Sequence, residues 1–199
     1  MLFLIAVSMI ITGTIFLSIF YIISLQPASL ALRIGDKAYK LCGIFRFIAF
    51  FFEMLVLTGY IIFIFGDLYV FPIMQTNVII IRIIGILVAL ITLTFMFIGV
   101  GYAGKEASVP QKDSKLYQGI YDYMRHPQTL GEMLSFFGIA LILNSWTLFI
   151  YSILFIPLFI SYTIIEDNDL AVRFGKSYID YTKRVGIFWK KRSIGVKNK

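Results

Sequence analysis

Two short segments hold most of the polar residues with which this chain could do chemistry. The stretch GIYDYMRHPQTLGEM, residues 119–133, contains the only histidine, His126, directly between Arg125 and Pro127. Further along the chain, an acidic cluster begins at Glu166. Carboxylate and imidazole groups bind charged ligands through charge-assisted hydrogen bonds. We therefore expect a functional site if the fold brings the two segments together.

Metal chemistry and nucleic-acid binding are not expected of this composition. One histidine and one cysteine, Cys42, cannot supply the ligand set of a zinc or haem site. The net charge is +7, but the basic residues flank hydrophobic runs, which favours attraction to anionic lipid over nucleic acid. We therefore predict membrane lipids among the partners, no metal and no nucleic acid.

The elements that must position these residues are membrane helices. Hydrophobic residues make up 59% of the 199-residue chain and charged residues 15%, and the mean hydropathy is +0.87. A soluble domain would carry about a quarter charged residues. The first 24 residues lack the charged start and cleavage site of a signal peptide, so we expect a retained helix there. The chain is predicted to be an integral membrane protein.

Five apolar runs approach or exceed the length of about 20 residues that crosses a bilayer. Because lipid offers the backbone no hydrogen-bond partners, each run is predicted to be helical, giving an all-α bundle of about five transmembrane helices. The runs are 2–23, 43–65, 78–104, 129–143 and 145–165. The fourth is short. Asn144 and Ser145 are predicted to form a tight turn between the last two spans, and Pro157 to kink the fifth.

Lysine and arginine counts predict the orientation of this bundle. The first and third loops and the tail are basic, whereas residues 66–77 hold no lysine or arginine. The N-terminus should therefore lie outside and the C-terminus in the cytoplasm. Nine polar residues would meet at the cytoplasmic end: Lys105, Tyr117, Tyr121, Arg125, His126, Glu132, Glu166, Asp167 and Asp169.

The tail and two features within the spans predict further structure. Apolar residues recur at three- and four-residue steps from Leu170 to Phe188, which indicates an amphipathic helix on the membrane surface or a lid over the bundle. Arg46, Glu53 and Arg82 are ionisable residues within predicted spans, which makes each a candidate functional residue. Because Arg46 and Glu53 share one helical face, we favour a structural ion pair inside the bundle for these two. The G-x-G-x-x-G pattern in 99–104 closes a membrane helix instead of following a strand, so we interpret it as close helix packing.

Taken together, LYQGIYDYMRHPQTLG and EDNDLAVRFGKSYIDYTKRV resemble the isoprenylcysteine carboxyl methyltransferase family and its phospholipid methyltransferase relatives. The resemblance covers residues 112–185. It implies a multi-span membrane enzyme that uses S-adenosylmethionine without a Rossmann domain. Without the resemblance, His126 is equally well explained as an interfacial residue hydrogen-bonded to backbone.

The resemblance also implies which residues bind the cofactor and which act on the acceptor. The cofactor-binding residues would be Asp113, Ser114, Lys115, Leu116, Tyr121, His126, Pro127, Gln128, Thr129 and Glu166. The candidate catalytic residues are Glu166, Tyr162 and Arg125.

Three positions depart from the family pattern. Thr129 replaces a tyrosine and Gly186 a proline, while Tyr162 replaces an arginine implicated in gripping the acceptor carboxylate. A phenol cannot replace the two parallel hydrogen bonds and the charge of a guanidinium. The substitution therefore weakens the prediction of the substrate more than the prediction of methyl transfer. The acceptor therefore stays open between an isoprenylcysteine-like carboxylate and a lipid head group.

We predict an S-adenosylmethionine-dependent methyltransferase that acts on a lipophilic acceptor. A membrane NADPH-dependent sterol-type reductase would share the cofactor loop, but Thr129 argues against it; a non-enzymatic bundle leaves the clustered polar groups unexplained. The expected organisation is a single membrane domain over 1–199. Its parts are the first three spans in 1–104, a cytosolic cofactor loop in 105–128, a helical hairpin in 129–165, and the amphipathic helix and basic tail in 166–199.

Overall fold

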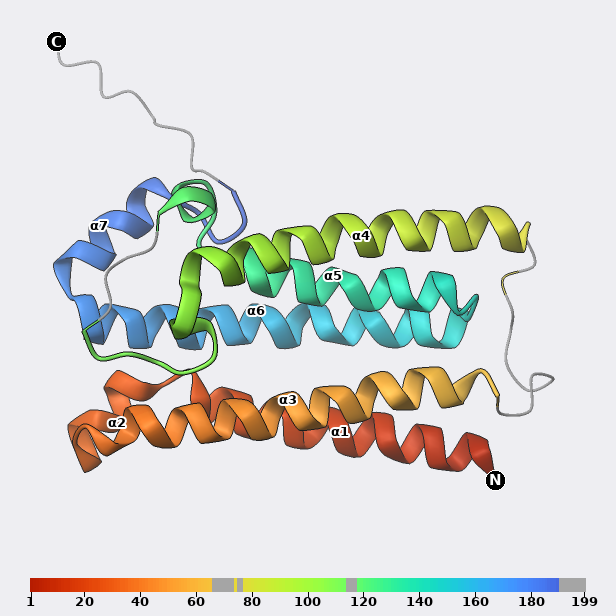
Figure 1. Ribbon diagram of the computed structural model, residues 1–199, viewed down its shortest axis with the longest axis horizontal. Coiled ribbons are helices and arrows are strands. Elements are labelled where there is room, and N and C mark those ends of the chain that lie inside the picture. Colours follow the sequence, from red (N-terminus) through yellow and green to blue (C-terminus); the bar gives the residue numbers. More distant parts are fainter. Residues whose placement is uncertain (66–73, 75–76, 114–117, 190–199) are drawn as a thin grey trace, which may run out of the picture.

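The computed structural model describes residues 1–65, 74, 77–113 and 118–189, and the regular elements in these ranges are all helices (Figure 1). The all-α prediction is confirmed. The helices are α1 (Leu2–Ser24), α2 (Pro27–Ile34), α3 (Lys37–Phe63), α4 (Val78–Ala103), α5 (Pro127–Ile142), α6 (Trp146–Phe174) and α7 (Lys176–Arg184). Two 3₁₀ turns, η1 (Gly104–Ala107) and η2 (Gly119–Asp122), lie between α4 and α5.

Four of these helices, α1, α3, α4 with η1, and α6, are long and apolar enough to cross a membrane. The fourth predicted span is α5, which has 16 residues. At 1.5 Å per residue α5 is about 24 Å long, less than the ~30 Å of a hydrocarbon core. It lies along α4 for its whole length (Figure 1). The integral membrane bundle is therefore built from four long helices and one short one.

Glycines let α4 and α5 approach closely. A Cβ atom added to Gly131 of α5 would lie 2.3 Å from the Thr92 carbonyl oxygen. Of the three glycines in the G-x-G-x-x-G pattern, Gly99 packs against Gln128, which confirms the packing interpretation at that position. A Cβ atom added at Gly101 would meet no other part of the described chain within 4 Å, and Gly104 ends α4 with a φ of 58°.

The pair α1 and α3 meets the rest of the bundle through aromatic rings and hydroxyl groups. The Tyr162 hydroxyl of α6 donates to Ser18 Oγ of α1 at 3.0 Å. Tyr60 of α3 and Ser152 of α6 form a second hydroxyl pair at 3.3 Å. The Tyr60 ring also packs edge-on against Phe136 of α5. These contacts hold the N-terminal helices against α5 and α6.

The turn between α5 and α6 confirms the predicted hairpin. Asn144 has a φ of 55°, and the Ser145 side chain caps α6 by accepting a hydrogen bond from the Leu148 amide at 3.3 Å. The helix α6 continues through Pro157.

The last long helix extends beyond the predicted fifth span. The helix α6 continues beyond Ile165 to Phe174, because no glycine or proline follows Pro157 until Gly175, which has a φ of 56°. Leu170 therefore belongs to α6, and the amphipathic helix that follows is the short α7. The helix α7 folds back beside the end of the bundle (Figure 1).

The helix α2 was missed in the sequence. It begins at Pro27, which suits the first turn of a helix, and ends at Gly35 with a φ of 73°. The Asp169 carboxylate of α6 accepts hydrogen bonds from the Ala28 and Ser29 amides at 3.1 and 2.7 Å. This cap ties α2 to α6 at the end of the bundle where α7, η1 and η2 also lie (Figure 1).

Candidate functional site

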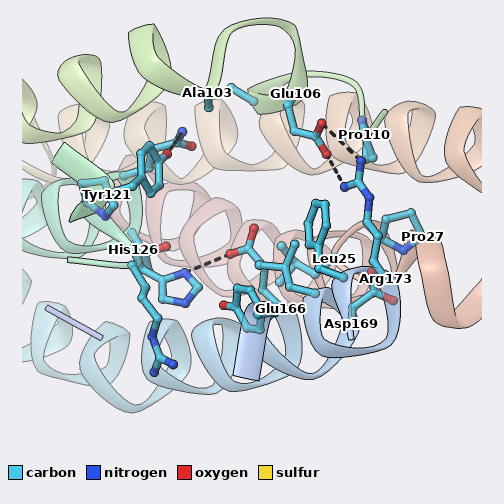
Figure 2. Close-up of a pocket in the computed structure, with 18 of the residues that line it drawn as sticks. Leu25, Pro27, Ala103, Glu106, Pro110, Tyr121, His126, Glu166, Asp169 and Arg173 are labelled. Atoms are coloured by element: carbon cyan, nitrogen blue, oxygen red, sulfur yellow. Dashed lines mark hydrogen bonds and ion pairs between the residues drawn. The ribbon is translucent and has the colours of Figure 1, made fainter. Parts of the chain in front are cut away.

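A cavity lies at this end of the bundle, between the helix ends and the loops that join them. Figure 2 shows His126 and Tyr121 on one side, Glu106, Arg173 and Asp169 on the other, and Glu166 between them. The described residues that line it come from α1, α2, α3, α4, η1, η2, α5, α6 and α7 and the adjoining loops. It therefore brings together the two polar segments from which the site was predicted.

His126 stands at the centre of the polar wall. Pro127 begins α5, so the preceding imidazole is held at the mouth of that helix, and His126 is only 4% exposed. Its Nδ1 lies 3.1 Å from Glu166 Oε2 and its Nε2 lies 2.8 Å from Asp167 Oδ1. Both ring nitrogens thus face carboxylates on α6.

The two carboxylates keep this imidazole charged. Burial by itself would lower the pKa of His126, but the hydrogen bonds and charges of Asp167 and Glu166 outweigh burial and raise the pKa to about 9. His126 is therefore an imidazolium at neutral pH and donates to both carboxylates. Glu166 remains 33% exposed, and among the described residues only its Oε2 has a hydrogen-bond partner.

Asp167 accepts hydrogen bonds from three side chains, those of Arg125, His126 and Tyr178, and so holds the His126 ring in place. Arg125 Nη2 lies 2.9 Å from Asp167 Oδ2, and the Tyr178 hydroxyl of α7 donates to the same carboxylate. The Arg125 and His126 amides donate to the Ile187 carbonyl oxygen at 3.0 and 3.2 Å. The segment after α7 thus holds the Arg125–His126 backbone in place.

Tyr121 connects the loop to α4 and α5. Its hydroxyl donates to the Gly99 carbonyl oxygen at 3.2 Å and accepts from Gln128 Nε2 at 2.9 Å. The Tyr181 hydroxyl of α7 donates to the Tyr121 carbonyl oxygen at 2.7 Å. Burial raises the pKa of Tyr121 above its usual value, so the phenol stays neutral and offers the cavity an aromatic ring and a polar edge.

An ion pair between Arg173 of α6 and Glu106 of η1 forms the opposite wall. The side chains are 5% and 10% exposed, and the Arg173 guanidinium lies 4.9 Å from the centre of the Phe174 ring. Neither residue was a candidate from the sequence. Their pairing joins segments far apart in the chain, and no local pattern indicates it.

The predicted cofactor residues fall into three groups. Tyr121, His126, Pro127, Gln128, Thr129 and Glu166 line the cavity. Asp113 is described but does not line it, and Ser114, Lys115 and Leu116 lie outside the described residues. Their assignment to the cofactor stays a prediction.

The candidate catalytic residues also differ in position. Arg125 and Glu166 line the cavity. Tyr162 is 1% exposed and lies behind the cavity wall, with its ring edge-on to Tyr21, whose centre is 5.0 Å away. Tyr21 itself lines the cavity. Tyr162 is thus separated from the cavity by a residue of α1, a helix that lies outside both sequence motifs.

The predicted Arg46–Glu53 ion pair was wrong. Arg46 Nη1 donates to the Glu106 and Ala107 carbonyl oxygens at 3.0 and 3.2 Å, and Nη2 donates to the Ser24 carbonyl oxygen at 3.2 Å. The arginine turns toward η1 and the end of α1 because open carbonyl groups lie there. In the sequence, only its position within an apolar span indicated that Arg46 could have a functional role.

Comparison with known proteins identifies the family of this chain. The phospholipid methyltransferase family model matches residues 77–177, just over half of the sequence. No curated protein and no solved structure matches the chain. The matched segment contains Tyr121, His126 and Glu166, which line the cavity, and Asp167, which pairs with His126. The chain belongs to the phospholipid methyltransferase family of membrane methyltransferases.

Proposed function

We propose that the protein transfers a methyl group from S-adenosylmethionine to a lipophilic acceptor. The observation that carries the proposal is Glu166, a partly exposed carboxylate that is held in the cavity by the His126 imidazolium at 3.1 Å. Such a carboxylate can bind an ammonium group through a charge-assisted hydrogen bond.

The side chains present fit this cofactor. Among the described residues Glu166 Oε1 has no partner, so it is available to a cationic group. Aromatic rings line the same cavity and favour a cation over their faces. These rings belong to Tyr21, Tyr121, Phe174, Tyr178 and Tyr181. S-adenosylmethionine, when bound, supplies a methyl group attached to a positively charged sulfur.

Some of these residues would bind the cofactor, and others would hold the binding residues in position. Glu166 would bind the ammonium group, and Tyr121, His126, Pro127, Gln128 and Thr129, which line the cavity, would hold the remainder. The assignment of Asp113, Ser114, Lys115 and Leu116 to the cofactor rests on the family resemblance alone. Arg125 is a positioning residue, because it pairs with Asp167 at 2.9 Å and so fixes the second partner of His126. This wall aligns the donor and excludes water, which is the main requirement of an in-line displacement.

The acceptor approaches from the lipid, where its apolar tail is already dissolved. Tyr162 brings no positive charge, and an unpaired carboxylate in an apolar site is costly to desolvate. An amine attacks in its uncharged form and avoids this cost. We therefore propose a lipid head group as the acceptor in preference to an isoprenylcysteine-like carboxylate.

Calorimetric titration of the purified protein in detergent tests this function. S-adenosylhomocysteine and NADPH are titrated separately into the same preparation. We expect binding of S-adenosylhomocysteine and none of NADPH. Binding of NADPH alone would replace the proposal with the reductase, and binding of neither ligand would favour a non-enzymatic bundle.

A further inference from the structure

Arg46 reaches the cavity from a part of the chain that the family match does not include. It lies in α3, whereas the match begins at residue 77. Arg46 lines the same cavity as Glu166 of α6. An arginine within an apolar span is costly unless it serves a ligand or a partner, so its use needs an explanation.

The hydrogen bonds of Arg46 leave part of the guanidinium unused. A guanidinium has five N–H donors. Three of them donate to the carbonyl oxygens of Glu106, Ala107 and Ser24. The remaining two are the Nε–H, which is buried with no partner among the described residues, and one N–H on Nη2. These adjacent nitrogens form the edge that binds a carboxylate with two parallel hydrogen bonds.

Arg46 also forms no ion pair with an acidic side chain within the described ranges. Arg125 pairs with Asp167, and His126 lies between Asp167 and Glu166. The other arginine of the wall pairs with Glu106. The contacts of Arg46 go to carbonyl oxygens, which carry only partial charges. The cavity wall therefore retains one guanidinium that is suited to an anion.

We propose that Arg46 binds the α-carboxylate of the methionine portion of S-adenosylmethionine while Glu166 binds its α-ammonium group. The inference rests on the proposed function and deepens it. A carboxylate and a guanidinium that line one cavity complement a zwitterion. The charge of Arg46 acts on Glu166, and both charges act on Tyr21, which places the three side chains within electrostatic range of one another. Binding affinity for the cofactor then depends on the N-terminal half of the chain as well as on the family motif.

The test compares two ligands that differ only by this carboxylate. S-adenosylhomocysteine and its decarboxylated form, which keeps the amine, the thioether and the adenosine, are titrated into the full-length protein. For the unmodified protein we expect tighter binding of S-adenosylhomocysteine. In Arg46→Met its affinity should fall about 10- to 100-fold, the effect of losing hydrogen bonds to a charged group. The affinity for the decarboxylated ligand should change less than about twofold.

Two further variants control for folding and for charge. Arg82→Met makes the same chemical change at an exposed arginine of α4 that does not line the cavity, and it should alter neither affinity. Arg46→Lys keeps the positive charge without the fork and should retain part of the preference for S-adenosylhomocysteine. If Arg46→Met does not fold, Arg46→Lys and the ligand pair in the unmodified protein still decide the question.

The outcomes separate this inference from the proposed function. If the unmodified protein binds neither ligand, both fail. Equal affinity of the unmodified protein for the two ligands overturns the role of Arg46 and leaves the proposed function intact. An equal loss of both affinities in Arg46→Met has the same meaning, because the arginine would then act through the fold or on the acceptor.

Discussion

His126 Nδ1 and Glu166 Oε2 are 3.1 Å apart, although 40 positions of sequence separate the two residues. One stands at the start of α5 and the other within α6, two helices that are joined by a tight turn at the opposite end of the bundle (Figure 1). The antiparallel hairpin therefore brings the imidazole to the carboxylate. The same pairing leaves one oxygen of Glu166 for a ligand.

Replacement of Glu166 by glutamine should weaken binding of S-adenosylhomocysteine by about 1.5–3 kcal/mol, because a charge-assisted hydrogen bond becomes a neutral one. Isothermal titration calorimetry measures the change. Asp180→Asn is the matched control, since Asp180 forms an exposed pair with Lys183 and does not line the cavity. Equal affinities of the Glu166→Gln variant and the unmodified protein would show that Glu166 does not bind the cofactor.

The contribution of His126 to stability should disappear in alkaline solution. Its folded-state pKa of about 9 lies above the ordinary value of 6.5, so the stabilisation is complete below pH 6.5 and is lost as the pH rises through 9. The shift corresponds to something on the order of 3 kcal/mol. Thermal unfolding in detergent from pH 6 to pH 10 should show the stability difference between the unmodified protein and His126→Gln shrinking with rising pH. A difference that stays constant would contradict a charged imidazole.

Gly131→Ala should destabilise the protein by about 1–3 kcal/mol, since the new Cβ would lie 2.3 Å from the Thr92 carbonyl oxygen and force α4 and α5 apart. Gly101→Ala provides the comparison, because no atom lies within 4 Å of the added Cβ. That variant should be neutral or more stable by up to about 1 kcal/mol. Thermal unfolding of both variants is the measurement, and equal effects would rule out glycine-dependent packing of the two helices.

Transfer of methyl groups should be faster to an amine head group than to a prenylcysteine carboxylate. Vesicles containing phosphatidylethanolamine and the analogue acetyl-farnesylcysteine provide the two acceptors, and incorporation of radiolabelled methyl groups measures the rates. The reason is the uncharged, buried Tyr162, which stands where the resemblance to isoprenylcysteine carboxyl methyltransferases predicts an arginine. Efficient methylation of the analogue alone would assign the carboxylate as the acceptor.

Labelling in intact cells tests the prediction that the cavity end of the bundle faces the cytoplasm. Lys112 is exposed and pairs only with exposed Asp36 among the described residues, so Lys112→Cys should not disturb the fold. We expect no reaction with an impermeant maleimide until the cells are opened. Cys42 is buried and gives no background. Labelling of intact cells from outside would contradict the predicted topology and place the cavity end outside the cell.

The sequence determined the features of this protein that depend on short stretches of chain. Long apolar runs must be helical in lipid, so α1 and α4 were predicted to within about one residue at each end, whereas α3 begins at Lys37, ahead of its predicted span. Local stereochemistry predicted the turn at Asn144 and the start of α5 at Pro127. The two polar segments were also expected at one end of the bundle, since span lengths and turns alone decide which helix ends coincide.

Only the tertiary structure decided which distant groups meet. Arg46 and Glu53 share a helical face, yet Arg46 donates to carbonyl oxygens of η1 and α1. A guanidinium has five N–H donors, so its orientation depends on all the acceptors around it and not on one residue of its own helix. The α7 residue Tyr178 reaches Asp167 because Gly175 reverses the chain there. Helical periodicity specifies which face a residue occupies, but it does not specify what packs against that face. The contribution of α1 and α3 to the cavity therefore emerged only from the assembled bundle.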